Sequence, residues 1–311
     1  MPWYSDFEPI CRFDVPLAQL TSFRLGGPAR YVFGPRSHAE LSSLVRCCRE
    51  NQIPWRVLGR GANVLADDAG FDGAIVRLSG PQFTTIQIDK RPDGSVMFAG
   101  GGADLGACVR AAVRTGLEGL EGLAGIPATI GGALQMNAGG RFGQIGAVVG
   151  RILVMHPDCR IQWIDRLRAN FAYRTSDLGD YLVLAGEFTL PEEDPKVLLD
   201  RYRQVWIYKR QHQPVAQRSA GCVFRNPEGQ AAGRLIEQAG CKGLRVGGAT
   251  VSTLHANFIV AEADCTAADV RALIQTVKNR VFDHSGLWLQ TEIEIWPHQV
   301  SNEARRQRSC A

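Results

Sequence analysis

A segment unusually rich in glycine, residues 116–146, is the strongest constraint on how this chain can fold. It reads GLEGLEGLAGIPATIGGALQMNAGGRFGQIG, and its glycine content is far above the average share. Neither helices nor strands favour so many glycines, because fixing a glycine costs more backbone freedom than fixing any other residue. The apolar residues between the glycines indicate that the segment is buried: Leu120, Leu123, Ile126, Ile130, Leu134 and Met136.

This glycine-rich segment favours a ligand-binding role over a flexible loop. Glycine allows positive φ and lets a ligand approach main-chain N–H groups closely, as in many sites for flavin and nucleotide pyrophosphates. The glycine spacing and the following helix do not match the dinucleotide fingerprint of a Rossmann fold. A flavin-binding fold of another type is therefore indicated. A second glycine-rich turn, GRGAN at 59–63, follows the apolar stretch 55–58 and would leave backbone donors free for a ligand.

The rest of the chain alternates between helical and strand patterns, which predicts a mixed α+β fold. Ser37 and Glu40 have capping-box spacing before one helix, and Thr266 and Asp269 have it before another. A third helix should end at Gly116. Apolar periodicity predicts further helices at 195–211 and 231–239, and strands at 55–58, 73–78, 96–99, 151–155, 182–189 and 287–296. The polar end of the chain, 301–311, is predicted to be disordered.

Composition excludes several classes of protein. The 311-residue chain is 45% hydrophobic, enough for two or three globular units. It has no signal-like N-terminus and no run of eighteen apolar residues, so neither secretion nor membrane insertion is expected. None of the nine cysteines lies in a Cys-x-x-Cys pair, so we expect neither a zinc site nor a disulfide framework. Reduced thiols in the cytoplasm are the simpler interpretation.

The charge distribution is more informative than the net charge of +4. Residues 201–225 contain six Arg or Lys and no Asp or Glu, which would attract a polyanion. The alternatives are a solvated helix face, nucleic acid, or a small molecule that carries a diphosphate. No nucleic-acid-binding module or set pattern of stacking aromatics is present, so nucleic acid is disfavoured.

Seven short motifs together resemble one family. They are TSFRLGG at 21–27, the turn at 59–65, GIPATIGGALQMNAG at 125–139, YRTS at 173–176, RQHQP at 210–214, SAGCVFRNP at 219–227 and AGCKGLRVGGATVSTLHANFIV at 239–260. Their order and spacing resemble the UDP-N-acetylenolpyruvoylglucosamine reductase (MurB) family over residues 20–297. The short interval between Arg174 and Arg210 resembles the subclass that lacks an additional tyrosine loop over the substrate. Closure over the substrate would then need another element.

The resemblance implies a fold and a division of the chain. We expect a flavin-binding fold of the vanillyl-alcohol oxidase type in two subdomains, followed by a separate α+β substrate-binding domain. The expected ranges are 1–80 and 81–194 for the FAD-binding subdomains, 195–286 for the substrate-binding domain, 287–297 for a strand returning to the flavin region, and 298–311 for the tail. The oligomeric state is not indicated.

The resemblance also implies an activity in peptidoglycan precursor synthesis. NADPH would reduce FAD, and the flavin would pass hydride to UDP-N-acetylglucosamine enolpyruvate to give UDP-N-acetylmuramate. Hydride addition builds negative charge on the substrate carboxylate, so the site needs a cation there and an acid at the protonated carbon. Arg174 matches the first role, and Glu292 would help to orient or protonate the enolate. By pattern alone, Arg174 is an ordinary surface arginine, and Glu292 lies on the polar face of an alternating strand.

Cys222 stands where the family pattern Gly-Ser-x-Phe has its serine. A thiol is a stronger acid than an alcohol, so it could donate the proton if it stays protonated. The neighbouring Arg218 and Arg225 could favour the thiolate, which would disable the donor. A small core cysteine is the structural alternative, and Ser219 is another possible donor. The family motif favours Cys222.

The remaining candidate residues follow from the same motifs. For FAD they are Gly59, Arg60, Gly61, Ala62, Asn63, Val64, Gly125, Ile126, Thr129, Gly131 and Gly132. For the substrate they are Tyr173, Lys209, Arg210, Asn226 and His255, although a core role for His255 is an equal alternative. Ala62 replaces a common serine, Ala128 a common glycine, and Arg141–Phe142 a common Ala-Tyr pair, which changes the expected contacts.

Two other functions remain open. The chain could be a flavoprotein oxidase or dehydrogenase that uses another substrate. The combination of Arg174, Glu292 and residues 210–227 argues against this alternative. It could also be a non-catalytic protein that binds FAD or a nucleotide sugar, with Cys222 marking lost chemistry.

Overall fold

The computed structural model describes residues 1–90 and 94–298. The first body is built on a four-stranded sheet with the order β1-β2-β5-β3. Its strands are β1 (Cys11–Pro16), β2 (Pro28–Phe33), β5 (Phe71–Val76) and β3 (Trp55–Val57). β1 and β2 are antiparallel, whereas β5 pairs in parallel with both β2 and β3. Short 3₁₀ helices η1 (Ser5–Ile10) and η2 (Leu17–Gln19) flank β1.

Helix α1 (His38–Glu50) begins where the capping-box pattern predicted. The Ser37 side chain accepts a hydrogen bond from the N–H of Glu40, and the Glu40 carboxylate accepts one from the N–H of Arg36. Both contacts satisfy N–H groups that a helix start otherwise leaves without partners. The buried face of α1 is the one the periodicity predicted: Leu41, Leu44, Val45 and Cys48.

The second body is a five-stranded antiparallel sheet with the order β11-β10-β12-β7-β6. Its strands are β6 (Ile86–Asp89), β7 (Ser95–Gly100), β10 (Val149–Met155), β11 (Ile161–Asp165) and β12 (Leu182–Leu190). The helices beside it are α2 (Pro81–Thr84), α3 (Leu105–Thr115) and α4 (Ile130–Gln135). α3 ends at Gly116, as predicted, because this residue adopts the left-handed conformation, with φ of 74°.

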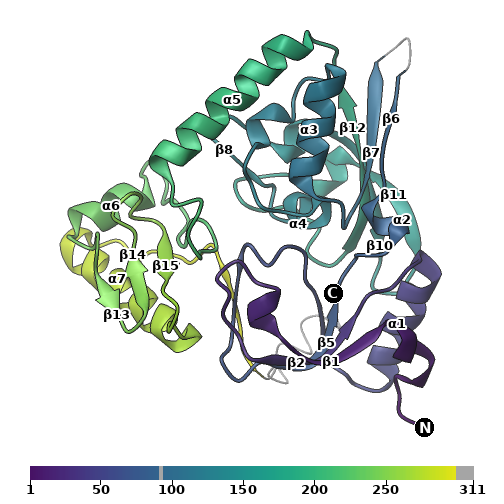
Figure 1. Ribbon diagram of the computed structural model, residues 1–311, viewed down its shortest axis with the longest axis horizontal. Coiled ribbons are helices and arrows are strands. Elements are labelled where there is room, and N and C mark those ends of the chain that lie inside the picture. Colours follow the sequence, from purple (N-terminus) through teal and green to yellow (C-terminus); the bar gives the residue numbers. More distant parts are fainter. Residues whose placement is uncertain (91–93, 299–311) are drawn as a thin grey trace.

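The third body follows the long helix α5 (Pro195–His212), which runs from the second body toward it (Figure 1). A small antiparallel sheet of β13 (Arg245–Val246), β14 (Ala249–Val251) and β15 (Ile259–Ala261) packs with α6 (Ala232–Gln238) and α7 (Ala267–Ser285). The predicted capping box of Thr266 and Asp269 is present at the start of α7.

The end of the described chain returns to the first body. β16 (Glu294–Trp296) pairs in parallel with β4 (Val64–Ala66). A second link comes from Asp68, whose carboxylate accepts hydrogen bonds from the N–H groups of Ala267 and Ala268 at the start of α7. An ion pair between Arg271 of α7 and Asp67 adds to these links between the first and third bodies.

One prediction about local structure is wrong, some short elements were not predicted, and one prediction cannot be compared. The strand expected over 287–296 is confined to β16, because the residues before it are held instead by a bridge between Phe224 and Thr291. The glycine-rich segment contains the helix α4 as well as η3 (Glu121–Leu123), η4 (Ile145–Ala147) and the hairpin strands β8 (Gly139–Gly140) and β9 (Gly143–Gln144). A further 3₁₀ turn, η5 (Arg166–Ala169), follows β11. The predicted tail, 301–311, lies outside the described residues.

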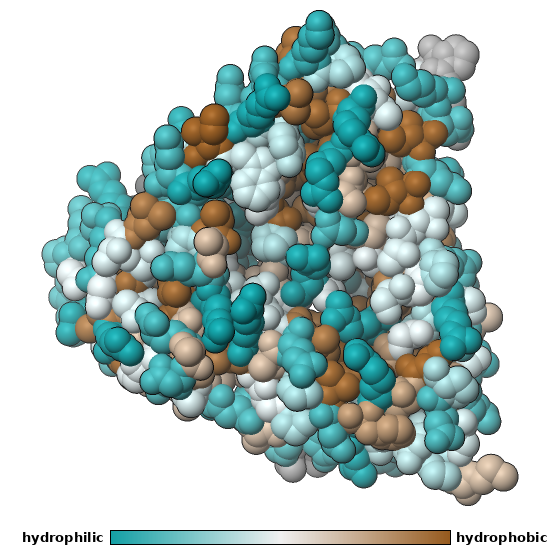
Figure 2. Space-filling view, viewed as in Figure 1, coloured by the Kyte–Doolittle hydropathy of each residue, from teal (hydrophilic) through white to brown (hydrophobic). Residues whose placement is uncertain are grey.

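The surface shows no single apolar face in the view of Figure 2, where hydrophobic side chains lie scattered among hydrophilic ones. Within residues 1–90 and 94–298, no helix has the length and apolar character needed to cross a membrane.

Candidate active site

A cavity of about 2170 Å³ is lined by residues from all three bodies. The first body contributes the glycine-rich turn at 59–64, and the second contributes 125–132 and 174–176. The third contributes residues 218–222, and the returning chain contributes Glu292. The predicted cofactor segments and the three predicted catalytic residues therefore share one cavity.

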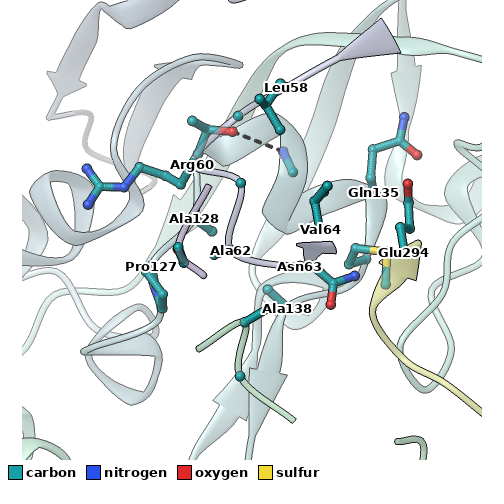
Figure 3. A pocket seen from close by; sticks show the side chains of 18 of the residues that line it. Leu58, Arg60, Ala62, Asn63, Val64, Pro127, Ala128, Gln135, Ala138 and Glu294 are labelled. Atoms are coloured by element: carbon teal, nitrogen blue, oxygen red, sulfur yellow. Dashed lines mark hydrogen bonds between the residues drawn. The ribbon is translucent and has the colours of Figure 1, made fainter. Parts of the chain in front are cut away.

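The turn at 59–63 is shaped by close packing of its glycines. Gly61 has φ of 61°, and a Cβ there would collide with the carbonyl of Leu20; a Cβ on Gly59 would lie 2.5 Å from the Thr129 hydroxyl. Within the described chain, the backbone N–H groups of 59–63 make no hydrogen bond to other backbone groups. Figure 3 shows side chains of this turn, including Ala62 and Asn63, around the same pocket as those of Pro127 and Ala128.

The segment 125–132 lies against this turn and lines the same part of the cavity. Thr129 caps α4, because its hydroxyl accepts a hydrogen bond from the N–H of Gly132. The N–H of Gly131 donates to the carbonyl of Gly101, and a Cβ on Gly131 would lie 3.0 Å from that oxygen. Glycine is therefore required here by the close approach of two main-chain segments. All eleven predicted cofactor residues line the cavity.

Arg174 and Glu292 form an ion pair in the cavity wall. Arg174 Nε lies 2.8 Å from Glu292 Oε1, and the two side chains are 21% and 11% exposed. The N–H is not aimed at that oxygen, since Arg174 Nε is a buried nitrogen without a hydrogen bond among the described residues. Burial raises the pKa of Glu292, and the positive charge of Arg174 opposes this effect. The pair thus retains donor capacity for an anionic ligand.

Cys222 lies beside this pair and remains a neutral thiol. Burial, with a smaller contribution from the negative charge of Glu292, raises its pKa to about 12, and the positive charge of Arg174 opposes this shift. Burial thus acts against the thiolate that Arg218 and Arg225 were expected to favour. The alternative donor Ser219 also lines the cavity.

Lys209 brings a second positive charge to the cavity from α5. Its ammonium group donates a hydrogen bond to the carbonyl of Ala124, next to the glycine-rich segment. Burial, together with the nearby positive charge of Arg174, lowers the pKa of Lys209 to about 8. An anionic ligand would raise this pKa again, because it favours the charged form of the side chain.

The other four predicted substrate residues do not line this cavity. Arg210 lies at a separate, smaller cavity of about 370 Å³. The exposed Tyr173 accepts a weak hydrogen bond, 3.4 Å long, from the N–H of Asn226. Asn226 itself accepts a bond from the N–H of Ala232 at the start of α6. His255 is half-buried, and its Nδ1 accepts a hydrogen bond from the N–H of Asn257.

Residues of the β8–β9 turn were not assigned to the site from the sequence. Arg141 and Phe142 line the cavity, and both contact Tyr208 on α5. The Arg141 guanidinium carbon lies 5.5 Å from the centre of the Tyr208 ring, and the Phe142 ring meets it edge-on at 5.2 Å. The only sign of this in the sequence was that Arg141 and Phe142 replace an Ala-Tyr pair common in the family.

Comparisons with known proteins agree with this architecture. A family model described as an FAD binding domain matches residues 29–165. A second model, for the C-terminal domain of UDP-N-acetylenolpyruvoylglucosamine reductase, matches residues 213–296. A protein of Heliobacterium modesticaldum named UDP-N-acetylenolpyruvoylglucosamine reductase is 41% identical over 93% of this chain and 92% of its own length.

Solved structures support both the fold and the family. The crystal structure of UDP-N-acetylenolpyruvylglucosamine reductase (MurB) from Thermus caldophilus is 37% identical, with a TM-score of 0.78, covering 92% of this chain and all of that one. A solvent-stable cholesterol oxidase, 16% identical with a TM-score of 0.50 over 60% of this chain and 39% of that one, shares the fold of the flavin-binding part alone. The expected α+β fold, a flavin-binding region of the vanillyl-alcohol oxidase type with a separate substrate-binding domain, is confirmed. The chain belongs to the UDP-N-acetylenolpyruvoylglucosamine reductase (MurB) family.

Proposed function

We propose that this protein reduces UDP-N-acetylglucosamine enolpyruvate to UDP-N-acetylmuramate, a step of peptidoglycan precursor synthesis, with FAD as cofactor and NADPH as hydride donor. The observation that carries the proposal is the meeting of Arg174, Glu292 and Cys222 in the cavity that contains both glycine-rich segments. A cation for the substrate carboxylate and a protonated acid for the adjacent carbon are the two groups that this reduction requires.

The glycine-rich part of the cavity fits FAD. Free backbone N–H groups at 59–63 suit a pyrophosphate, and the glycine at 61 could not be replaced without a collision. We assign the cofactor to Gly59, Arg60, Gly61, Ala62, Asn63, Val64, Gly125, Ile126, Thr129, Gly131 and Gly132. When bound, FAD supplies the hydride that it receives from NADPH.

The catalytic roles follow from charge and protonation. Arg174 lines the cavity with a guanidinium that has more donors than its pairing with Glu292 uses, and we assign it to the substrate carboxylate and the charge that develops there. Cys222 holds its proton at neutral pH and can deliver it to the carbon beside the carboxylate. Glu292 is paired with Arg174, and burial, aided by the negative charge of Glu292, keeps Cys222 protonated. We assign Lys209, which lines the same cavity, to the anionic part of the substrate.

The remaining assignments extend this proposal. Tyr173, Arg210, Asn226 and His255 lie outside the cavity lining, so they would act only on parts of the substrate that reach beyond it. We propose residues 1–80 and 81–194 as FAD-binding subdomains, 195–286 as the substrate-binding domain and 287–297 as the returning segment. Free cysteines throughout the described chain and a nucleotide-sugar substrate favour the cytoplasm.

The decisive experiment measures NADPH oxidation by the purified, FAD-loaded protein with and without UDP-N-acetylglucosamine enolpyruvate. Substrate-dependent oxidation with formation of UDP-N-acetylmuramate supports the proposal. Reduction of the flavin followed by reaction with oxygen only, whether or not the enolpyruvyl substrate is present, would instead favour an oxidase. Bound FAD that NADPH never reduces would favour a non-catalytic binding protein.

A further inference from the structure

A buried asparagine joins the glycine-rich segment to the turn that carries Arg174. Asn137 follows α4 and is only 1% exposed. Its side-chain amide donates hydrogen bonds to the carbonyl of Ala172 (2.8 Å) and to the side chain of Gln144 (3.2 Å). Its side-chain oxygen accepts a bond from the N–H of Gly146 (3.0 Å). One side chain therefore satisfies three groups, two in the stretch 144–146 and one at Ala172, and nothing in the proposed reaction uses it directly.

The carbonyl of Ala172 takes part in the hydrogen bonds that close a tight turn, residues 172–175. The N–H of Ala172 donates to the carbonyl of Thr175, and the N–H of Thr175 donates back to the carbonyl of Ala172. Tyr173 and Arg174 lie between these two residues, and Arg174 has φ of 55°. The left-handed conformation is uncommon for a residue with a long side chain. It persists only where the surrounding structure fixes it.

Asn137 is well suited to hold the 172–175 turn in place. It also adopts the left-handed conformation, with φ of 43°, which asparagine tolerates better than most residues. Its packing is tight, because a Cβ on Gly146 would lie 2.8 Å from the Asn137 oxygen and 2.5 Å from the Phe171 ring. A second bond, from the Ser176 hydroxyl to the carbonyl of Gln135, ties the other side of the turn to the end of α4.

We propose that Asn137 is a positioning residue, which holds the 172–175 turn so that Arg174 meets both Glu292 and the substrate carboxylate. The proposal rests on the function assigned to Arg174 above. It explains how an arginine in a sparsely populated backbone conformation is held beside Glu292. It also links the segment assigned to FAD with the group assigned to the substrate, through one buried side chain.

Two substitutions separate the hydrogen bonds from the backbone conformation. Asn137→Gly keeps access to positive φ but removes all three side-chain bonds. Asn137→Asp keeps the size and the acceptor for Gly146, and replaces the donor to Ala172 by an oxygen. The second variant retains most of the packing and serves if the first fails to fold. Ser95→Ala is the matched control, because Ser95 is buried, bonds to Glu192 and lies outside the cavity lining.

The test compares the two half-reactions by stopped flow in the FAD-loaded enzyme. For both Asn137 variants, oxidation of the reduced enzyme by the enolpyruvyl substrate should slow by about 10- to 100-fold, as expected for a displaced reacting group. Reduction by NADPH should change by less than about twofold, and Ser95→Ala should slow neither step. When Arg174 is already replaced by alanine, adding Asn137→Gly should hardly slow the substrate half-reaction further. The effects of two substitutions do not add up when the two residues act as a unit. Equal loss in both half-reactions, or full additivity, would overturn the proposal.

A crystal structure of Asn137→Gly separates this proposal from the proposed function. Arg174 should move away from Glu292, beyond the 4.0 Å limit of an ion pair. If the wild type does not turn over the enolpyruvyl substrate, the proposed function fails, and the displacement still decides whether Asn137 positions Arg174. If Arg174 stays at its 2.8 Å separation from Glu292, the positioning role is excluded whatever the substrate is.

Discussion

Arg174 Nε lies 2.8 Å from Glu292 Oε1, although the two residues come from a turn of the second body and from the segment that returns from the third. The pair closes the wall of the cavity where Cys222 is placed. Burial raises the pKa of both Glu292 and Cys222, and Arg174 opposes both shifts. The protonation of Glu292 and of Cys222 therefore depends on Arg174, and removing its charge should alter both.

Removing either charge of the ion pair should affect the second half-reaction selectively. Arg174→Ala should lower the rate with the enolpyruvyl substrate by about 10²- to 10³-fold, the usual cost of losing one donor to a developing negative charge. Glu292→Gln should lower it by a smaller factor and leave FAD bound. Rapid mixing of NADPH-reduced enzyme with substrate measures this step. A matching loss in NADPH reduction would contradict the assignment.

Cys222 should be replaceable by serine but not by alanine. Cys222→Ser restores the residue of the family motif and should retain turnover, whereas Cys222→Ala should reduce it by about 10²- to 10⁴-fold, the usual range for a general acid. Steady-state kcat with saturating substrate measures the effect. FAD content and the NADPH half-reaction serve as controls for folding. An alanine variant with normal kcat would transfer the role to Ser219 or to another group.

The neutral state of Cys222 predicts its response to pH and to alkylating reagents. An ordinary protein thiol begins to ionise near pH 9, but Cys222 keeps its proton up to about pH 12. Between these values the unfolded chain loses a proton that the native state retains, so this group lowers stability as pH rises. Iodoacetamide should therefore modify Cys222 slowly at pH 8, as peptide mass spectrometry would measure. Rapid modification would show a thiolate and disqualify Cys222 as the acid.

Local sequence signals were sufficient where one residue type determines the structure. Ser37 and Thr266 predicted the starts of α1 and α7 because each side chain bonds a helix N–H. Gly116 predicted the end of α3 for an equally local reason. Helix α4 was missed because two of its six residues are glycine, and its stability comes from packing against β12 rather than from propensity.

Contacts between distant segments could not be predicted from pattern alone. Glu292 was expected within an alternating strand, but its segment is held by the Phe224–Thr291 bridge and by the N–H of Glu292 donating to Val223. Arg174 would have been an ordinary surface arginine by its pattern, and only the family motif pointed to its role. Asn137 lies within the motif at 125–139, but its bond to Ala172, 35 residues away, cannot be read from the sequence.

Lys209 should make ligand binding pH-dependent near neutrality. Its pKa of about 8 in the folded protein lies below the ordinary value of 10.5, so between these values the unfolded chain binds more protons. The contribution of Lys209 to the free energy of unfolding therefore rises between pH 8 and pH 10.5. Over the same range, Lys209 loses the positive charge that would bind an anion. Affinity for UDP-N-acetylmuramate should fall by about tenfold above pH 8, the worth of one charged contact. Flavin-fluorescence titration measures it.

The matched control for Lys209 is a neutral side chain of similar length. Lys209→Met should weaken binding at pH 7 and remove the change across pH 8, since no titrating charge remains. An unchanged pH profile in Lys209→Met would assign the dependence to another group.

Asp68 should contribute to the docking of the third body on the first. Its carboxylate accepts two N–H groups at the start of α7, at 2.7 and 2.9 Å, where a negative charge is also favoured by the helix dipole. Asp68→Ala should lower the free energy of unfolding by about 1 kcal/mol, the usual cost of a lost helix cap. Chemical denaturation of the FAD-loaded protein measures it. Asp72→Ala, which removes an exposed ion pair with Arg30, should have a smaller effect.

The turn at 59–63 offers a test of the cofactor site that does not depend on catalysis. Gly61→Ala places a methyl group against the carbonyl of Leu20 and forces alanine to adopt φ of 61°, so the turn must move. Because the N–H groups assigned to the pyrophosphate move with it, FAD affinity should fall by tenfold or more, about 1.4 kcal/mol. Equilibrium dialysis of the apoprotein measures the dissociation constant. Gly233→Ala is the control, since its Cβ meets only ordinary contacts inside α6, and normal affinity in Gly61→Ala would remove this turn from the cofactor site.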